Sequence, residues 1–401
     1  MKKTISIMLV TLLFAACKKD LRPDQQALID ASAQSANDKS NDALIDSVNL
    51  LNAKSNIGLR EESSSAGHVY TLSNATSGNK VIDYKRGADG KLIYLASYPT
   101  GGNGSGGGLG NQGAVILTDE NEDLIAVNAG SNTISLFKVS GNGLQLKSTI
   151  NSGGSRPISI AQHDDLVFVL NAGGNGNIAG FKLDDNRLTA ISNSSRPLSS
   201  SVAGAAEISF VNEGKIIVVT EKATNKIISY KINEDGIPGA FHSITSANST
   251  PFGFAVGRNG HIYVSEAAGG AANASTVSSY YVNYNGEITL VTGPVPTNQS
   301  AACWVVLTDN GKYAYTTNTA SNTLSAFNTN NWGGLSLSSS VAALTESGPI
   351  DAALSDESKF LYILNSGSHS ITVYVVGNNG ALNSLQSIGG LISGANGLAA
   401  K

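Results

Sequence analysis

The sequence has few charged residues, few cysteines and few of the motifs that usually carry chemistry. Asp, Glu, Lys and Arg make up 14 % of the 401 residues, against about 25 % in an average globular protein. The formal net charge is −4 and no basic run follows the first three residues, so we expect no nucleic-acid partner. There is no Cys pair, no His-Glu-x-x-His and no Gly-x-Ser-x-Gly, so we expect no metal site and no cofactor.

Glycine and apolar residues are plentiful instead. The chain has 44 glycines and 41 % hydrophobic residues, which favours an all-β protein with many tight turns. The stretch 124–139, LIAVNAGSNTISLFKV, reads as a short apolar strand, a turn of small residues and a second, alternating strand. This pattern is typical of a β-hairpin.

The same hairpin recurs along the chain with a period of about 50 residues. In each unit one residue ends the second strand and an aromatic follows in the third strand. The strand-ending residues are Asn74, Asn128, Asn171, Glu221, Glu266, Asn318 and Asn365. Their aromatic partners are Tyr84, Phe137, Phe181, Tyr230, Tyr280, Phe327 and Tyr374. Seven such units predict a seven-bladed β-propeller with four-stranded blades.

The two ends of the repeat region complement each other. The first unit begins at His68 without an inner strand, whereas residues 394–401, GANGLAAK, resemble an inner strand with nothing after it. We therefore expect the C-terminal strand to join the first unit and close the ring, which removes exposed strand edges. The predicted propeller domain spans residues 67–401.

The N-terminus predicts export and a lipid anchor. Lys2 and Lys3 precede the apolar run 5–14, and residues 1–16 read as a signal peptide. Phe14-Ala15-Ala16-Cys17 resembles a bacterial lipobox, with Cys17 as the lipidated residue; the alternative is an ordinary signal peptide before a chance cysteine. Residues 17–66 are polar and read as a tether. We expect a monomer that contacts a membrane only through this anchor, at the outer membrane, facing the periplasm or the cell surface.

Two glutamates stand where the other units carry asparagine. The loops after the second strands share one face of the ring with the loops that enter the inner strands, around the mouth of the channel. Asparagine at a strand end usually satisfies turn groups. Glu221 and Glu266 break that pattern in adjacent units. They could be ligand-facing acids, with Glu221 as a general acid or base, or salt-bridged rim residues.

Five further residues are expected on the same face of the ring. Glu207, Trp304 and Asp351 lie near the starts of inner strands, and Arg156 and Arg196 lie in the loops before them. Buried carboxylates without a partner are costly, so cations, water or a shared proton must compensate them. An arginine–carboxylate ring could bind a small anionic or polyhydroxylated ligand, or it could be purely structural.

The glycine-rich segment 100–113, TGGNGSGGGLGNQG, precedes the second unit. It contains Gly-x-Gly-x-x-Gly twice, but a β-like run follows it where a dinucleotide site needs a helix. We interpret it as a loop on the channel face, acting as a lid or as a simple connection.

Several units resemble one family of propellers. The stretches 216–232 (IIVVTEKATNKIISYKI), 249–270, 301–327 and 360–376 (FLYILNSGSHSITVYVV) look like the lactonase-type seven-bladed propellers, a family that includes 6-phosphogluconolactonases and 3-carboxymuconate-cyclising enzymes. The resemblance covers residues 68–401. It implies cofactor-free opening or closing of a lactone ring by a His, an Arg and a Glu, and Glu221 matches the family Glu.

The sequence departs from the family at the other two groups. The tripeptide beginning at Pro157 lacks the family His, and Glu207 with the two alanines before it replaces the family Pro-Arg-His. Two hypotheses follow. The first is an enzyme acting on lactones or sugar acids, with Glu221 as acid or base and Arg156 or Arg196 holding a carboxylate or oxyanion. The second is a non-catalytic propeller that binds a ligand or a protein.

Overall fold

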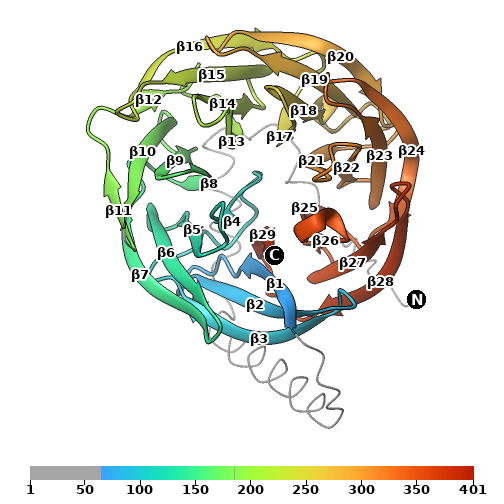
Figure 1. The fold of residues 1–401 in the computed structure, drawn as a ribbon, viewed down its shortest axis with the longest axis horizontal. Helices are drawn as coiled ribbons and strands as arrows, with labels where there is room; N and C mark the ends of the chain where they lie inside the picture. The colour runs from blue at the N-terminus through green and yellow to red at the C-terminus, as the bar shows by residue number, and fades with distance from the viewer. Residues whose placement is uncertain (1–64, 185) are drawn as a thin grey trace, which may run out of the picture.

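Seven antiparallel β-sheets stand around a central channel (Figure 1). The computed structural model describes residues 65–184 and 186–401. Six sheets have four strands, and one has a two-residue fifth strand. We number these sheets as blades 1 to 7 in chain order. The predicted seven-bladed β-propeller with four-stranded blades is confirmed.

The strands of the blades, from the channel outward, have the following bounds. Blade 1 contains β29 (Asn396–Ala400), β1 (Ser65–Leu72), β2 (Lys80–Gly87) and β3 (Leu92–Pro99). Blade 2 contains β4 (Val115–Leu117), β5 (Asp123–Asn128), β6 (Thr133–Ser140) and β7 (Gly143–Asn151). Blade 3 contains β8 (Pro157–His163), β9 (Leu166–Asn171), β10 (Asn177–Asp184) and β11 (Arg187–Ala190), with β12 (Arg196–Pro197) also paired to β10.

The remaining blades follow the same order. Blade 4 contains β13 (Ala205–Val211), β14 (Ile216–Glu221), β15 (Lys226–Ile232) and β16 (Pro238–Thr245). Blade 5 contains β17 (Pro251–Val256), β18 (His261–Glu266), β19 (Thr276–Val282) and β20 (Ile288–Pro296). Blade 6 contains β21 (Ala302–Leu307), β22 (Tyr313–Asn318), β23 (Thr323–Thr329) and β24 (Leu335–Leu344). Blade 7 contains β25 (Pro349–Leu354), β26 (Phe360–Asn365), β27 (Ser370–Val376) and β28 (Leu382–Gly389). Two short 3₁₀ turns, Ala268–Gly270 and Asp356–Ser358, lie between strands.

The repeat read from the sequence describes the packing of the blades. The predicted strand-ending residue closes the second strand in blades 2 to 7, and in blade 1 Asn74 lies two residues beyond β1. The seven predicted aromatics of the third strands are all at most 1 % exposed: Tyr84, Phe137, Phe181, Tyr230, Tyr280, Phe327 and Tyr374. Each blade therefore contributes one large side chain to the apolar layer between neighbouring sheets.

The two chain ends meet in blade 1. Strand β29 pairs antiparallel with β1, with Val69 opposite Ala400 and Leu72 opposite Asn396. The backbones of His68 and Lys401 exchange hydrogen bonds of 3.2 and 2.9 Å, and Arg86 Nε donates to the Lys401 carbonyl at 3.0 Å. The C-terminal strand thus closes the ring, as predicted.

The predictions for residues 1–16 and for Cys17 lie outside the described residues, as does almost all of the predicted tether. Among residues 65–184 and 186–401, no helix has the length and apolar character needed to cross a bilayer.

Removing residues 394–401 should destabilise the whole propeller, because it deletes the inner strand of blade 1 and exposes the edge of β1. Losing the buried side chains of Leu398 and Ala399 together with the β29 ladder should cost about 4 kcal/mol or more. Chemical denaturation of the truncated chain checks this. The control is Leu95→Ser on the outer strand β3, where the side chain is 47 % exposed. Equal stabilities of the two variants would contradict the role of β29.

Candidate functional site

The strand-ending position is a buried hydrogen-bonding hub in the blades that carry asparagine. Asn128 Nδ2 donates to Thr133 Oγ1 at 3.1 Å and to Ser135 Oγ at 2.7 Å. Asn318 repeats the arrangement with Thr323 and Ser325, at 3.1 and 2.9 Å. The amide therefore ties the end of the second strand to the start of the third.

Glu266 forms the same kind of hub with the direction of the hydrogen bonds reversed. Its Oε1 accepts from Ser246 Oγ at 2.7 Å and from Tyr280 OH at 2.8 Å. Its Oε2 accepts from Thr276 Oγ1 at 2.6 Å and from Ser278 Oγ at 2.7 Å. With four hydroxyl donors and no exposed surface, this carboxylate is fully satisfied inside blade 5.

Glu221 also binds groups of the chain itself. Its Oε1 accepts from the Ser199 backbone amide at 2.8 Å, and its Oε2 accepts from Ser199 Oγ and from Thr224 Oγ1. The side chain has no exposed surface. Glu221 therefore fastens the loop that enters blade 4, and no ion pair to Lys226 is present in the described part of the chain.

The structure does not bring the two arginines to the channel carboxyls. Arg196 donates to the carbonyls of Asn193 and Ser195, both at 2.8 Å. Arg156 contributes its backbone amide to Asn132 Oδ1 at 2.7 Å. Both arginines lie in the loops before inner strands, and neither lines the channel cavity. The arginine–carboxylate ring considered from the sequence is not formed.

The central channel holds a cavity of about 410 Å³. Inner strands of blades 1, 2, 3, 4 and 7 line it, and its lining includes Gln112, Asp119, Gln162, Glu207 and Asp351. The cavity extends from Gln112, before β4, to the turn after β4, where Asp119 is exposed. This volume lies within the range of small-molecule sites.

Glu207 and Asp351 enter the cavity from opposite sides of the ring. They belong to β13 and β25, three blades apart, and each sits at a β-bulge near the start of its strand. A bulge re-aims a side chain, and here it accompanies two carboxyl groups that line the channel. Glu207 is 6 % exposed and Asp351 is 2 % exposed. These two predicted residues are therefore brought together at one cavity.

Both carboxyls are poised toward their protonated forms. Burial raises the pKa of the Glu207 carboxyl well above its usual range, and the nearby Asp351 charge raises this pKa further. Burial likewise raises the pKa of Asp351. Glu207 Oε2 accepts from the Phe254 amide at 2.5 Å, and Asp351 Oδ1 accepts from the Ala352 amide at 2.8 Å. Asp351 Oδ2 has no hydrogen-bond partner within the described residues.

The glycine-rich segment covers one end of the cavity. In Figure 1 the chain before β4 projects into the middle of the ring. Gln112 Nε2 donates to the Val305 carbonyl at 2.9 Å, and the Val305 amide donates back to Gln112 Oε1 at 3.2 Å. Trp304 Nε1 donates to the Asn111 carbonyl at 2.6 Å. Trp304 thus anchors the segment across the ring rather than lining the cavity, and the segment is a packed cover.

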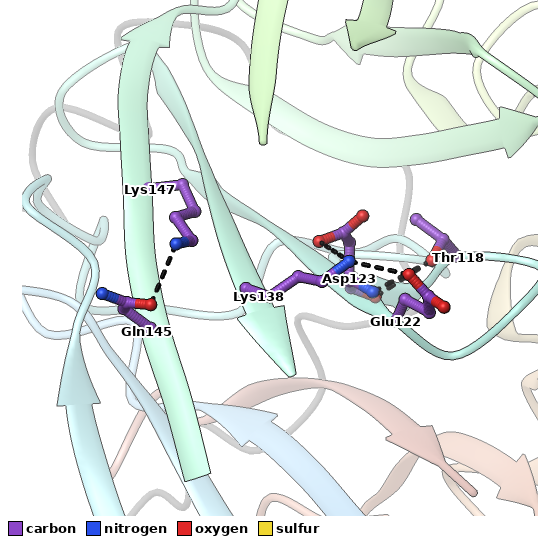
Figure 2. A network of polar contacts seen from close by, with 6 residues as sticks. All are labelled: Thr118, Glu122, Asp123, Lys138, Gln145 and Lys147. Carbon is purple, nitrogen blue, oxygen red and sulfur yellow. Dashed lines mark hydrogen bonds and ion pairs between the residues drawn. The ribbon is translucent and has the colours of Figure 1, made fainter. Parts of the chain in front are cut away.

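The opposite end of the cavity is the turn after β4, held by a polar network (Figure 2). Lys138 Nζ, on β6, lies 2.8 Å from Glu122 Oε2 and 3.5 Å from Asp123 Oδ1. The Thr118 amide donates to the Asp123 carbonyl at 3.0 Å, and the Asp123 amide donates to Thr118 Oγ1 at 3.1 Å. The network fixes the turn that carries Asp119 to the mouth of the cavity.

Comparison with known proteins agrees with this architecture. The family model described as lactonase, 7-bladed beta-propeller, matches residues 305–390, which lie in blades 6 and 7. The whole ring is a seven-bladed β-propeller, and its blades 6 and 7 are similar to the lactonase family. A search of curated proteins finds no match to this propeller.

Solved structures share the fold of this propeller. A candidate 6-phosphogluconolactonase from Bacteroides uniformis superposes with a TM-score of 0.67 at 16 % identity, covering 84 % of this chain and 99 % of that one. A second, from Bacteroides fragilis, gives 0.65 at 15 % identity, covering 86 % and 100 %. The periplasmic gluconolactonase of Pseudomonas aeruginosa gives 0.63 at 15 % identity, covering 83 % and 99 %.

Sequence reasoning missed the residues that define the two ends of the cavity. Gln112 was read only as part of the glycine-rich segment, and Asp119 was given no role in a site. Gln112 joins the segment before blade 2 to blade 6, and Asp119 places the turn after β4 at the cavity. No local sequence pattern predicts either of these long-range placements. Within residues 65–184 and 186–401, no group of three or more His, Cys, Asp or Glu side chains could hold a metal ion.

Proposed function

We propose that this lactonase-type propeller hydrolyses or forms a lactone of a sugar acid inside the channel cavity, with Glu207 and Asp351 as its acid–base pair. The observation that carries the proposal is two buried carboxyls with raised pKa on opposite walls of one cavity of about 410 Å³. Residues with perturbed pKa in a concave site are the usual participants in proton transfer. The match of blades 6 and 7 to the lactonase family supports this class of reaction.

The chemistry needs only proton transfer. In hydrolysis, an ionised carboxylate removes a proton from water as the water oxygen attacks the lactone carbonyl carbon. The second, protonated carboxyl then gives its proton to the ring oxygen as the carbon–oxygen bond breaks. Burial opposes the ionisation of both carboxyls and the Asp351 charge further opposes that of Glu207, which favours a state with Asp351 ionised and Glu207 protonated. Ring closure runs through the same steps in reverse.

A non-catalytic binding propeller is the second candidate function. The hydrogen bonds of Glu221 favour it, because this residue matches the family Glu yet is occupied by Ser199 and Thr224. In that case the same cavity binds a polyhydroxylated ligand without turnover.

Replacing either cavity carboxyl should remove the activity and leave the fold intact. Glu207→Gln and Asp351→Asn keep the size of each side chain, and each should lower the hydrolysis rate of D-glucono-1,5-lactone about 10²–10⁴-fold. A pH-stat assay measures the rate, and a melting curve confirms folding. The matched control is Glu346→Gln, because Glu346 binds Ser370 and Ser387 outside the cavity.

Two results would contradict the assignment of the acid–base pair. One is a large rate loss in Glu221→Gln while the cavity variants stay active, which would identify Glu221 of blade 4 as the catalytic residue. The other is a wild-type chain that binds lactones but turns none over, which would support the binding propeller.

We also propose that Cys17 carries a lipid that holds the propeller at the outer membrane, with residues 18–66 as a spacer and the domain acting as a monomer. The lipobox-like sequence before Cys17 supports this. Cys17→Ser should move the protein from the detergent phase to the aqueous phase in a phase-partition assay. Ser47→Ala in the spacer is the control. Unchanged partitioning of Cys17→Ser would contradict the anchor.

A further inference from the structure

The walls of the channel cavity carry acidic side chains and no basic ones within the described residues. Asp119, Glu207 and Asp351 line it, and none of its lining residues within the described parts of the chain is Lys, Arg or His. The remaining lining is aliphatic, amide, glycine or serine. A site that recognises a phosphate or carboxylate normally supplies a guanidinium, an ammonium or converging backbone amides.

Three basic residues of the ring make their contacts outside the cavity lining. Lys222 lies over the Phe252 ring at 4.8 Å and donates to the Gly110 carbonyl. The Arg86 guanidinium lies 5.8 Å from the centroid of the Phe360 ring and binds the Lys401 carbonyl. Arg196 binds two carbonyls of its own loop. A ligand anion in the cavity would therefore meet carboxyl groups without a compensating positive charge.

The carboxyl groups of Glu207 and Asp351 offer polar atoms to a ligand, and the lining also includes Asp119, Asn121 and Ser209. The side-chain amide of Gln112 is used by Val305, and that of Gln162 is used by Asp119 and Asp164. Asp351 Oδ2, on a residue that is 2 % exposed, has no partner within the described residues although it belongs to the cavity wall. An unpaired buried oxygen of this kind is costly unless a ligand hydroxyl or water satisfies it.

We propose that the cavity selects an uncharged polyhydroxylated ligand, of the class of unphosphorylated sugar lactones and sugars, over its phosphorylated or carboxylated counterparts. The ligand hydroxyls donate to and accept from the Glu207 and Asp351 carboxyls, which suits groups that can each be protonated or ionised. An added phosphate or carboxylate would lie among acidic side chains with no basic lining residue beside it, and it would oppose the ionisation of the carboxyl that acts as base. This inference rests on the proposed use of the cavity, but it concerns binding rather than turnover.

Paired probes, one neutral and one with a single anionic group, test the selectivity. Calorimetry with the wild-type protein at pH 7 compares D-glucose with D-glucose 6-phosphate, and D-glucitol with D-gluconate. We expect each neutral probe to bind at least about tenfold more tightly than its anionic partner. Equal or tighter binding of the anionic probes would overturn the proposal, and so would failure of all four probes to bind.

Variants of the cavity show whether the carboxyls cause the discrimination. The double variant Glu207→Gln with Asp351→Asn keeps the side-chain volumes and removes both ionisable groups. The ratio of neutral-probe to anionic-probe affinity should therefore fall several-fold. Asp165→Asn, at an exposed ion pair with Lys182, is the matched control and should keep the wild-type ratio. An unchanged ratio in a folded double variant would overturn the proposal.

The outcomes separate this inference from the proposed reaction. Neutral probes that bind selectively, with no lactone turned over, would leave the selectivity standing and reject the enzyme. Turnover of lactones by a protein whose anionic probes bind as tightly as the neutral ones would support the enzyme and reject the selectivity.

Discussion

The pairing of β29 with β1 is the interaction on which the rest of the molecule depends. A propeller has a channel with a continuous wall only if its last blade meets its first. Here the five-residue strand β29 at the C-terminus completes that wall. Leu398 and Ala399 belong both to this closure and to the lining of the cavity. Ring closure and cavity formation are therefore one event, and the burial of Glu207 and Asp351 follows from it.

The strand-ending position of the blades accepts either an asparagine or a glutamate, although one donates hydrogen bonds and the other accepts them. An asparagine amide donates to hydroxyls at the start of the third strand, as Asn128 and Asn318 do. In blade 5 the carboxylate of Glu266 accepts from such hydroxyls, since a hydroxyl can turn to donate. At the hub, both oxygens of Glu266 have donors without a ligand. Glu207 and Asp351 instead line a cavity in which Asp351 retains an unsatisfied oxygen.

The fold was predictable from the sequence because its signals are local and repeated. The repeated strand-ending residue and the aromatic that follows it predicted the seven blades and their order. The incomplete first unit and the extra C-terminal strand predicted the ring closure. Glu207 and Asp351 were also found, because each stands near the start of an inner strand.

The side-chain directions and mutual contacts of the site residues were not predictable from the sequence. The direction of the Arg196 side chain depends on loop carbonyls, and the cover of the cavity depends on the contact of Gln112 with Val305, 193 residues away in the chain. Glu221 and Glu266 stood out in the sequence as exceptions to a pattern. The hydroxyls that satisfy them come from neighbouring strands and loops, which only the folded chain places in reach.

The central claim is that the closed channel holds two carboxyl groups whose protonated forms the fold favours. Because folding raises both pKa values, their protons persist above the pH at which ordinary carboxyls ionise, about 4. Infrared difference spectroscopy of the folded protein, titrated upward from pH 4, measures the carboxylic-acid carbonyl band directly. We expect a band that persists above pH 4 and shrinks in Glu207→Gln and in Asp351→Asn. A wild-type band that vanishes near pH 4, or one that neither substitution alters, would contradict it.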